Sequence, residues 1–264
     1  MNKAEFEMGL RLLARANPPS TLYRYRQPID RTLAEIINQQ IYLAPQSALN
    51  DPFECSAPIC GTAESMRRFL IEVYAPDRGI SPTEAIQKFG SCALDFEWIH
   101  ERRRAAFAKA IEETGFICLS AVPNSIRMWS YYSQAHEGIC VGFDTKKRPF
   151  WASIKVTYEN PSAPLDVVDA LMRDPSEIAA HVTLRKAAEW EFEQEYRIAV
   201  SVLGDQPRLV PFESSAITEV RFGARIKDDY RTKVMEAISH LPLRPKLIQM
   251  GCDHDRFILT ESIL

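Results

Sequence analysis

The residues best suited to chemistry are densest in K-A-A-E-W-E-F-E-Q-E-Y-R-I-A-V, which spans residues 186–200. There a helix-like run becomes an alternating run of β-formers, and Glu193, Glu195 and Arg197 are spaced two residues apart at the change. In an extended chain this spacing would place all three side chains on one face. Burying two carboxylates and a guanidinium is costly unless they are paired. The pattern therefore indicates either a catalytic site or a structural ion-pair network.

A pair of arginines lies near the start of the chain, in T-L-Y-R-Y-R. On a strand Arg24 and Arg26 would share one face and repel each other unless an anion neutralises them. Because a guanidinium binds phosphate bidentately, the pair suits a phosphate or a dinucleotide. The structural alternative is that they pair with Glu54, Glu193 or Glu195.

The segment N-D-P-F-E (50–54) is a strong turn signal. Asn50 and Asp51 can build an Asx turn, and the proline fixes the loop. The structural interpretation is a rigid turn with Phe53 tucked into the core. The functional one gives Asp51 or Glu54 the role of a base or of a partner for an arginine.

The middle of the chain combines C-L-S (118–120) with M-W-S-Y-Y-S-Q-A-H-E-G (128–138). On a helix Trp129, Tyr132 and His136 would share a face. Such a stripe is typical of a core, but amphipathic rings also suit stacking on a flat ligand. His136 is either a general base or a hydrogen-bonded structural residue.

Composition narrows the class of protein. The chain has 264 residues, 46% hydrophobic and 25% charged, with a net charge of −3, which is typical of a globular protein without general affinity for nucleic acid. Six scattered cysteines without a C-x-x-C pair predict neither a zinc site nor a disulfide framework. No apolar run reaches the roughly 18 residues that a membrane span needs, so we expect a cytoplasmic protein without a membrane partner. No G-x-G-x-x-G or G-K-[ST] motif is present.

Periodicity predicts an irregular order of strands and helices, which favours an α+β fold. The expected strands are 21–26, 41–44, 116–120, 139–144, 153–158, 196–203, 207–212, 217–222, 246–250 and 257–260. The expected helices are 3–16, 31–39 (capped by Asp30), 63–74, 82–90, 94–113 (ended by Gly115), 126–134 (capped by Asn124 or Ser125), 163–192 and 228–240. We expect one domain over 1–264, with a mixed, mostly antiparallel sheet and a helical insertion at 55–115 packed against it.

Several motifs occur in an order that resembles a bacterial family known only as a domain of unknown function. They are L-Y-R-Y-R, I-Y-L-A-P-Q-S-A-L-N-D-P-F-E, F-I-C-L-S, M-W-S-Y-Y-S-Q-A-H-E-G-I-C-V-G-F-D, V-T-Y and W-E-F-E-Q-E-Y-R. The marks of the family are N-D-P-F-E, M-W-x-x-Y and E-x-E-Y-R, and the resemblance covers about residues 21–260. The family name implies no activity.

More distantly, the chain is similar to ADP-ribosyltransferases, including toxin-like members. These carry an Arg or His on an early strand, a Ser, Thr or Tyr on a middle strand and a Glu opening a later strand. Arg24 or Arg26, Ser120, and Glu195 or Glu193 occupy those places here. No S-T-S triplet follows Ser120, which departs from the pattern of the transferases.

This similarity implies roles for the matched residues. The arginine would hold the pyrophosphate or ribose of NAD, and Ser120 would shape the nicotinamide pocket. Glu195 would bind the nicotinamide ribose and stabilise an oxocarbenium-like transition state, with Glu193 sharing the work. Trp129 or Tyr132 would stack on the nicotinamide.

The leading hypothesis is therefore an enzyme that cleaves the glycosidic bond of NAD. It would transfer ADP-ribose to a macromolecule, either nucleic acid or protein, as a defence or toxin-type effector. One alternative is a non-catalytic sensing or interaction module with a structural ion-pair network. Another is a metal-dependent nuclease that uses Asp51, Glu54, Glu193 and Glu195, because carboxylates suit Mg²⁺.

Overall fold

The computed structural model describes residues 11, 13–89, 108–160, 163–202 and 206–264. The fold is α+β, as the sequence predicts, with a mixed, mostly antiparallel sheet. The chain divides into two compact units. The larger unit comprises residues 16–44, 115–156 and 188–264, and the smaller one comprises 1–15, 45–114 and 157–187. The helical insertion expected at 55–115 belongs almost wholly to the smaller unit.

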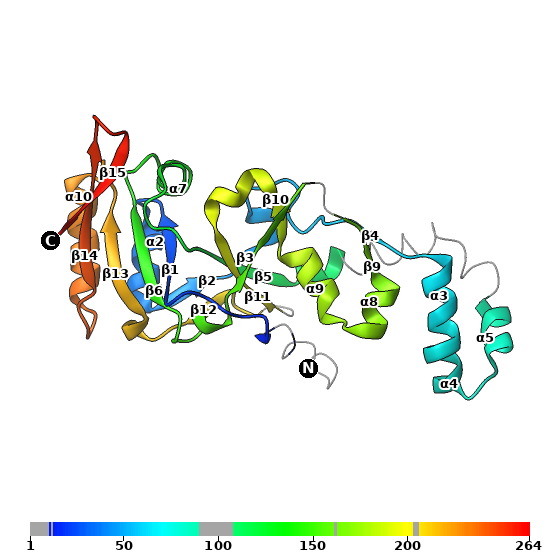
Figure 1. Ribbon diagram of the computed structural model, residues 1–264. Coiled ribbons are helices and arrows are strands. Elements are labelled where there is room, and N and C mark those ends of the chain that lie inside the picture. Colours follow the sequence, from blue (N-terminus) through cyan, green and yellow to red (C-terminus); the bar gives the residue numbers. More distant parts are fainter. Residues whose placement is uncertain (1–10, 12, 90–107, 161–162, 203–205) are drawn as a thin grey trace. The chain divides into compact units, whose positions relative to one another are not determined.

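The larger unit is built on one long sheet with the strand order β15-β14-β13-β6-β1-β5-β11-β7. Neighbouring strands β14, β13 and β6 lie side by side in Figure 1. Within this sheet β13 and β14 pair in parallel, whereas β1–β5, β1–β6, β6–β13, β7–β11 and β14–β15 are antiparallel pairs. The strands are β1 (Thr21–Arg26), β5 (Thr114–Ser120), β6 (Ile139–Asp144), β7 (Ile154–Lys155), β11 (Glu195–Ser201), β13 (Ile217–Phe222), β14 (Lys246–Asp253) and β15 (Ile258–Ile263).

Two short additions complete this unit. Strands β2 (Gln40–Tyr42) and β12 (Leu209–Pro211) pair with each other, antiparallel. The two-residue strand β3 (Ala44–Pro45) pairs with β5, where the chain passes from one unit to the other.

Helices cover both faces of the long sheet. Ile36 of α2 (Asp30–Asn38) and Val234 of α10 (Asp228–Ser239) belong to the main hydrophobic cluster on one face. Met128 and Trp129 of α7 (Ile126–Tyr132) form a second cluster with Tyr25. Strand β1 separates these clusters, because alternate residues of a strand point to opposite faces.

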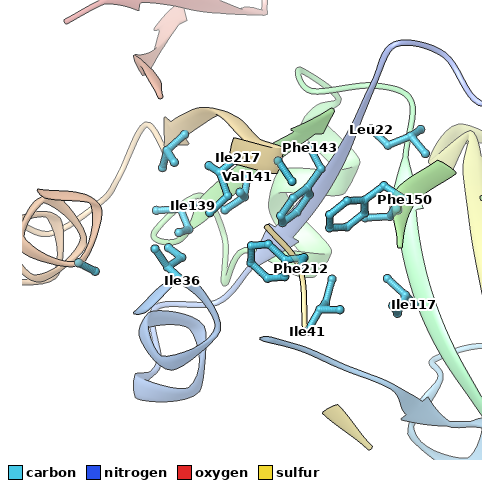
Figure 2. Packing of buried hydrophobic residues seen from close by; sticks show 14 of the residues in the cluster. Leu22, Ile36, Ile41, Ile117, Ile139, Val141, Phe143, Phe150, Phe212 and Ile217 are labelled. Atoms are coloured by element: carbon cyan, nitrogen blue, oxygen red, sulfur yellow. The ribbon is translucent and has the colours of Figure 1, made fainter. Parts of the chain in front are cut away.

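Aromatic rings fill the centre of the main cluster, as Figure 2 shows. Phe143 stacks on Phe150 with ring centroids 4.3 Å apart, and Phe212 meets Phe143 edge-on at 5.6 Å. Phe150 is fully buried. Rings in such contacts add about 0.5–1.5 kcal/mol per pair beyond the burial of their area, so this cluster is the main source of stability for the larger unit.

The described residues of the smaller unit are mostly helical and form two small hydrophobic clusters. One is centred on Leu70, Ala75 and Ala85, and the other on the helix that begins at Val167. The unit contains β4 (Ile59–Cys60), α3 (Ala63–Phe69), the π-helix η2 (Leu70–Tyr74), α4 (Ala75–Arg78), α5 (Pro82–Phe89), β8 (Thr157–Glu159), β9 (Leu165–Asp166), α8 (Val167–Arg173), α9 (Ser176–Thr183) and β10 (Arg185–Ala187).

Strong local signals predict several elements correctly. The strands expected at 21–26, 139–144 and 217–222 have the expected bounds. Ser125 caps α7, since its hydroxyl accepts a hydrogen bond from the Met128 amide at 3.4 Å. Asp30 does not cap α2. It lies in the first turn, and the capping position belongs to Ile29.

Two other expectations are wrong. Gly115 does not end a helix, because it lies within β5, where Leu43 and Val202 pack too closely for a larger residue. The helix expected over 163–192 is broken into α8 and α9 at Asp174-Pro175. It then gives way to β10, which pairs with β8, and to the 3₁₀ segment η5 (Ala188–Glu193). The helices expected at 3–16 and 94–113 lie largely outside the described residues.

A tight turn follows α7 and connects it to β6. Gln134, Ala135 and His136 all have left-handed backbone angles, with φ of 51°, 51° and 73°. For residues other than glycine this conformation costs of order 1–3 kcal/mol each. Backbone hydrogen bonds offset this cost, among them His136 N–H to Trp129 O at 3.2 Å and Arg225 N–H to His136 O at 3.0 Å.

No helix among the described residues is long and apolar enough to cross a membrane.

Gly138→Ala tests how closely this turn packs on β1. A Cβ at this position would lie 2.0 Å from the backbone oxygen of Arg26, so the backbone must move. We expect a loss of about 1–3 kcal/mol or more in the free energy of unfolding, measured by urea denaturation. Gly251→Ala is the matched control, because its Cβ would meet only the Thr260 side chain, which can rotate. Equal losses in the two variants would contradict the expectation.

Candidate functional site

The loop after β5 (residues 121–125) is held by side chains from three directions. The Tyr25 hydroxyl donates to Val122 O at 2.7 Å, and the Trp129 indole donates to Pro123 O at 2.9 Å. The Ser120 hydroxyl donates to Glu193 O at 2.6 Å and accepts from the Val122 amide at 3.1 Å. The loop therefore fixes α7 relative to the end of η5.

Glu193 and Tyr132 meet where α7 faces η5. The carboxylate of Glu193 is buried and accepts a short hydrogen bond from the Tyr132 hydroxyl. Ser120 binds the backbone of the same glutamate. We call Ser120, Tyr132 and Glu193 the α7–η5 site. It unites residues from three separate motifs.

Glu193 does not share the strand geometry of its neighbours. It ends η5, and Gln194 has a left-handed φ of 43° before β11 begins at Glu195. The sequence-based expectation of three extended residues therefore applies only to Glu195 and Arg197. This break lets the Glu193 side chain turn toward α7.

Glu195 and Arg197 form a buried bidentate ion pair. The Arg197 Nε–H donates to Glu195 Oε1 at 2.7 Å, and Nη2–H donates to Oε2 at 2.8 Å. Both residues are almost fully buried, with Arg197 1% exposed. A carboxylate held in this way has its charge compensated on both oxygens. The arrangement matches the structural ion-pair interpretation for these two residues.

Exposed rings and a cation border the α7–η5 site. Tyr131 is 62% exposed, and its ring centroid lies 5.9 Å from that of the half-buried Phe192. The guanidinium of Arg127 lies 4.2 Å from the centroid of Phe192. Trp190 also contacts Phe192, at 5.9 Å. We call Arg127, Tyr131 and Phe192 the aromatic rim.

Trp129 is part of the core. It is fully buried, and its ring meets Tyr25 edge-on at 5.2 Å and lies parallel to His136 at 6.3 Å. In this position its ring is covered by protein and offers no surface on which a ligand could stack.

His136 lies outside the helix on which the sequence places it. Its Nε2 lies 3.2 Å from the Ser130 hydroxyl, which donates to Ile126 O. Its Nδ1 is buried and has no hydrogen-bond partner among the described residues. Burial, followed by the charge of Arg225, lowers the pKa of His136.

Arg24 and Arg26 lie on the opposite face of the sheet from Ser120. Arg24 faces Val141 of β6, which belongs to the main cluster, whereas Tyr23 is opposite Ser120 in the β1–β5 register. Cross-strand partners share a face, and successive residues alternate. The arginines and the α7–η5 site therefore cannot line one common pocket within this sheet.

The N-D-P-F-E segment forms the expected Asx turn. The Asp51 carboxylate accepts a hydrogen bond from the Phe53 amide at 2.9 Å, while Asn50 is exposed. Phe53 is 72% exposed, so the expectation that it enters the core is wrong. Glu54 is buried with its carboxylate 3.9 Å from Lys186 Nζ in the same unit.

Three features of the folded protein have little or no signal in the sequence. Glu35, not Glu54, Glu193 or Glu195, is the ion-pair partner that Arg24 and Arg26 of β1 share. The sequence indicates this role only through the position of Glu35, which comes one residue before the buried Ile36 of an amphipathic helix. No sequence pattern indicates that Lys186 is buried or that Arg127 meets Phe192, because both features depend on contacts between distant segments.

Within the described residues no group of three or more His, Cys, Asp or Glu is placed to hold a metal ion.

Arg197→Met tests the buried pair. Removing the guanidinium leaves the Glu195 charge in the interior, so we expect a loss of about 3–5 kcal/mol in unfolding free energy. Lys147→Met is the control, because its 3.0 Å pair with Glu213 is exposed to solvent and such pairs contribute about 0–1 kcal/mol. Chemical denaturation monitored by fluorescence measures both. A loss for Arg197→Met no larger than that of the control would contradict the structural role.

His136→Gln tests the lowered histidine pKa. The folded state favours the neutral ring, so as the pH falls below about 6.5 the unfolded chain takes up a proton first, and stability falls. We expect the melting temperature of the wild type to drop between pH 7.5 and pH 5, and the variant to drop less. Part of the drop should remain, because burial also lowers the pKa of His181. The exposed His240→Gln should keep the full drop; if it matches His136→Gln, His136 is not responsible.

Comparisons with known proteins support one coarse assignment. Residues 128–198 match the model of a family described as protein of unknown function (DUF2971). The match covers well under half of the chain and includes Tyr132 and Glu193 but not Ser120. Neither the curated proteins nor the solved structures contain a match. Over this segment the chain is therefore similar to a domain-of-unknown-function family, DUF2971.

Proposed function

We propose that the protein is an NAD-using, ADP-ribosyltransferase-like enzyme whose reaction takes place at the α7–η5 site. The observation that carries the proposal is the meeting of Ser120, Tyr132 and Glu193, which come from a middle strand, a helix and the segment before a later strand. The acceptor would be a macromolecule, as in defence or toxin-type effectors.

The chemistry requires a carboxylate close to a ribose. The bond between C1′ of the ribose and the nicotinamide nitrogen breaks, and nicotinamide leaves with the electron pair. A nucleophilic atom of the acceptor then forms a bond to C1′ and loses its proton to a base. A carboxylate stabilises the positive charge that develops on the sugar and can hydrogen-bond a ribose hydroxyl.

Glu193 is better placed for this role than Glu195. Both Glu195 oxygens bind Arg197, so the pair carries no net charge toward a substrate. The Glu193 carboxylate accepts a hydrogen bond from the Tyr132 hydroxyl where α7 meets η5, beside the exposed ring of Tyr131. Tyr132 can orient this carboxylate toward a bound ribose. In this proposal Glu193 is the catalytic carboxylate and Glu195 a structural one.

The aromatic rim supplies the groups that would recognise the rest of the dinucleotide. The exposed ring of Tyr131 and the half-buried Phe192 offer surfaces on which a nicotinamide or adenine ring can stack. Arg127, which is exposed beside them, can bind a phosphate. Arg127 thus takes the role that the sequence suggests for Arg24 or Arg26, which lie on the other face.

Glu193→Gln tests this proposal. With labelled NAD and a panel of protein and nucleic-acid acceptors, we expect the variant to lose about 10²-fold or more of the wild-type rate. Glu191→Gln is the matched control, since Glu191 is an exposed glutamate of the same η5 segment. It should retain the wild-type rate. Arg127→Gln should weaken NAD binding, measured by calorimetry.

Two results would reject the transferase proposal. One is a wild-type protein that neither turns over NAD with any acceptor nor binds it. The other is turnover that Glu193→Gln leaves unchanged. Far-UV circular dichroism of each variant shows whether a lost activity reflects a lost fold.

A non-catalytic sensing or interaction module is the second candidate, and the Glu195–Arg197 pair favours it. An almost fully buried, bidentate ion pair on a strand inside the sheet is typical of scaffolding. This candidate requires that NAD leaves the melting temperature of the wild type unchanged. A shift in melting temperature with NAD that disappears in Arg127→Gln would exclude it.

A further inference from the structure

A small cavity lies under β1 on the face of the sheet opposite the α7–η5 site. Its volume is about 10 Å³, and Arg24, Arg26 and Glu35 supply its charged groups. The remaining wall is mostly apolar and includes Ile36, Phe143 and Phe212, three of the side chains labelled in Figure 2.

The two arginines share a single carboxylate oxygen. Arg26 Nη2–H donates to Glu35 Oε1 at 2.8 Å, and Arg24 Nη2 lies 3.8 Å from the same oxygen. Arg24 Nη2–H also points at Tyr42 O, at 3.4 Å. The side chains of Arg24, Arg26 and Glu35 are 11%, 17% and 12% exposed.

Two guanidinium nitrogens remain unused. Arg24 Nη1 and Arg26 Nε are buried and have no hydrogen-bond partner among the described residues. Buried N–H groups that bind nothing are costly, and more so on a charged group. Both nitrogens belong to side chains that line the same cavity.

The charges in the cavity do not balance. Two guanidinium groups and one carboxylate leave one excess positive charge in a mostly apolar space. Arg26 reflects this imbalance, because burial and the charge of Arg24 lower its pKa to about 10. One further negative charge would neutralise the cavity and give both nitrogens an acceptor.

We propose that the cavity binds one small inorganic anion of halide size between the guanidinium groups of Arg24 and Arg26. The volume limits the ligand to a single small particle, because about 10 Å³ is close to the least space that one water molecule needs. Chloride is somewhat larger than water, so the flexible side chains of Arg24 and Arg26 must move slightly apart to admit it. A nucleotide phosphate needs more space and is not the expected ligand. The proposal does not rest on the proposed function, since the two sites lie on opposite faces of the sheet.

The bound anion stabilises the packing of α2 on the sheet. Glu35 and Ile36 are consecutive residues of α2, while Arg24 and Arg26 belong to β1. An anion that binds the folded state alone raises the free energy of unfolding with its concentration. Chloride should therefore stabilise the protein beyond the general effect of salt.

Thermal melting in matched salts tests the proposal. Sodium chloride and sodium bromide are compared with sodium gluconate at constant ionic strength, so that general screening is equal. We expect chloride and bromide to raise the melting temperature by a few degrees in a saturable way, and gluconate to have no such effect. The line width of the ³⁵Cl resonance, broadened by exchange with a bound site, reports binding directly.

Arg24→Met is the diagnostic variant. It removes the excess charge and leaves the Arg26–Glu35 hydrogen bond in place, so the fold should persist. We expect it to lose both the chloride-dependent shift and the excess line width. Lys155→Met is the control, because Lys155 is an exposed cation on β7 and does not line the cavity. It should keep both.

Three outcomes would overturn the proposal. Equal melting in chloride and gluconate, without ³⁵Cl broadening, would show that a water molecule alone serves the two nitrogens. A chloride effect that survives in Arg24→Met would place the anion elsewhere. A stabilisation by phosphate or NAD, but not by chloride, that requires Arg24 would show that the cavity opens to a larger ligand.

Discussion

The alternation of side chains along β1 divides the larger unit into two chemically different faces. Tyr23 and Tyr25 point to the side of α7, and Arg24 and Arg26 to the side of α2. Because a strand offers no intermediate direction, a residue in the sequence Y-R-Y-R can serve only one of these faces. This constraint places Arg24 and Arg26 on the opposite face of the sheet from Ser120, although the similarity to transferases implied one common pocket.

On the α7 side, one set of contacts holds the loop after β5 and the α7–η5 site together. Ser120, Tyr25 and Trp129 hold the loop that leads into α7. That loop positions Tyr132 against Glu193, and the strained turn at 134–136 then returns the chain to β6. Strained residues persist only where the surroundings enforce them, and they concentrate near functional sites. The position of this turn next to the α7–η5 site is consistent with that tendency.

The two glutamates of E-x-E illustrate how environment assigns different roles to identical side chains. Glu195 belongs to a strand and finds Arg197 two residues away on the same face, so its charge is compensated locally. Glu193 precedes the strand and is released from the alternation by the left-handed Gln194. Its carboxylate accepts a hydrogen bond from the Tyr132 hydroxyl of α7. The same reasoning explains the cavity under β1, where one carboxylate serves two arginines and an excess charge remains.

Sequence by itself determined the α+β class, the exact bounds of three strands including Y-R-Y-R, and the Asx turn at Asp51, and it narrowed the cap of α7 to Asn124 or Ser125. Alternation, capping and turn chemistry act over a few residues. The sequence also singled out Glu193, Tyr132 and Ser120 as residues of interest. Tertiary structure alone decided that these three meet, that Trp129 is core, that Glu35 is the partner of the arginines and that the helix expected at 163–192 ends in a strand. Those outcomes depend on which distant segments pack together, and one residue of left-handed backbone at Gln194 was enough to redirect a side chain. Local patterns carry no information on such long-range contacts, since the energy that selects them comes from burial and pairing in the folded state.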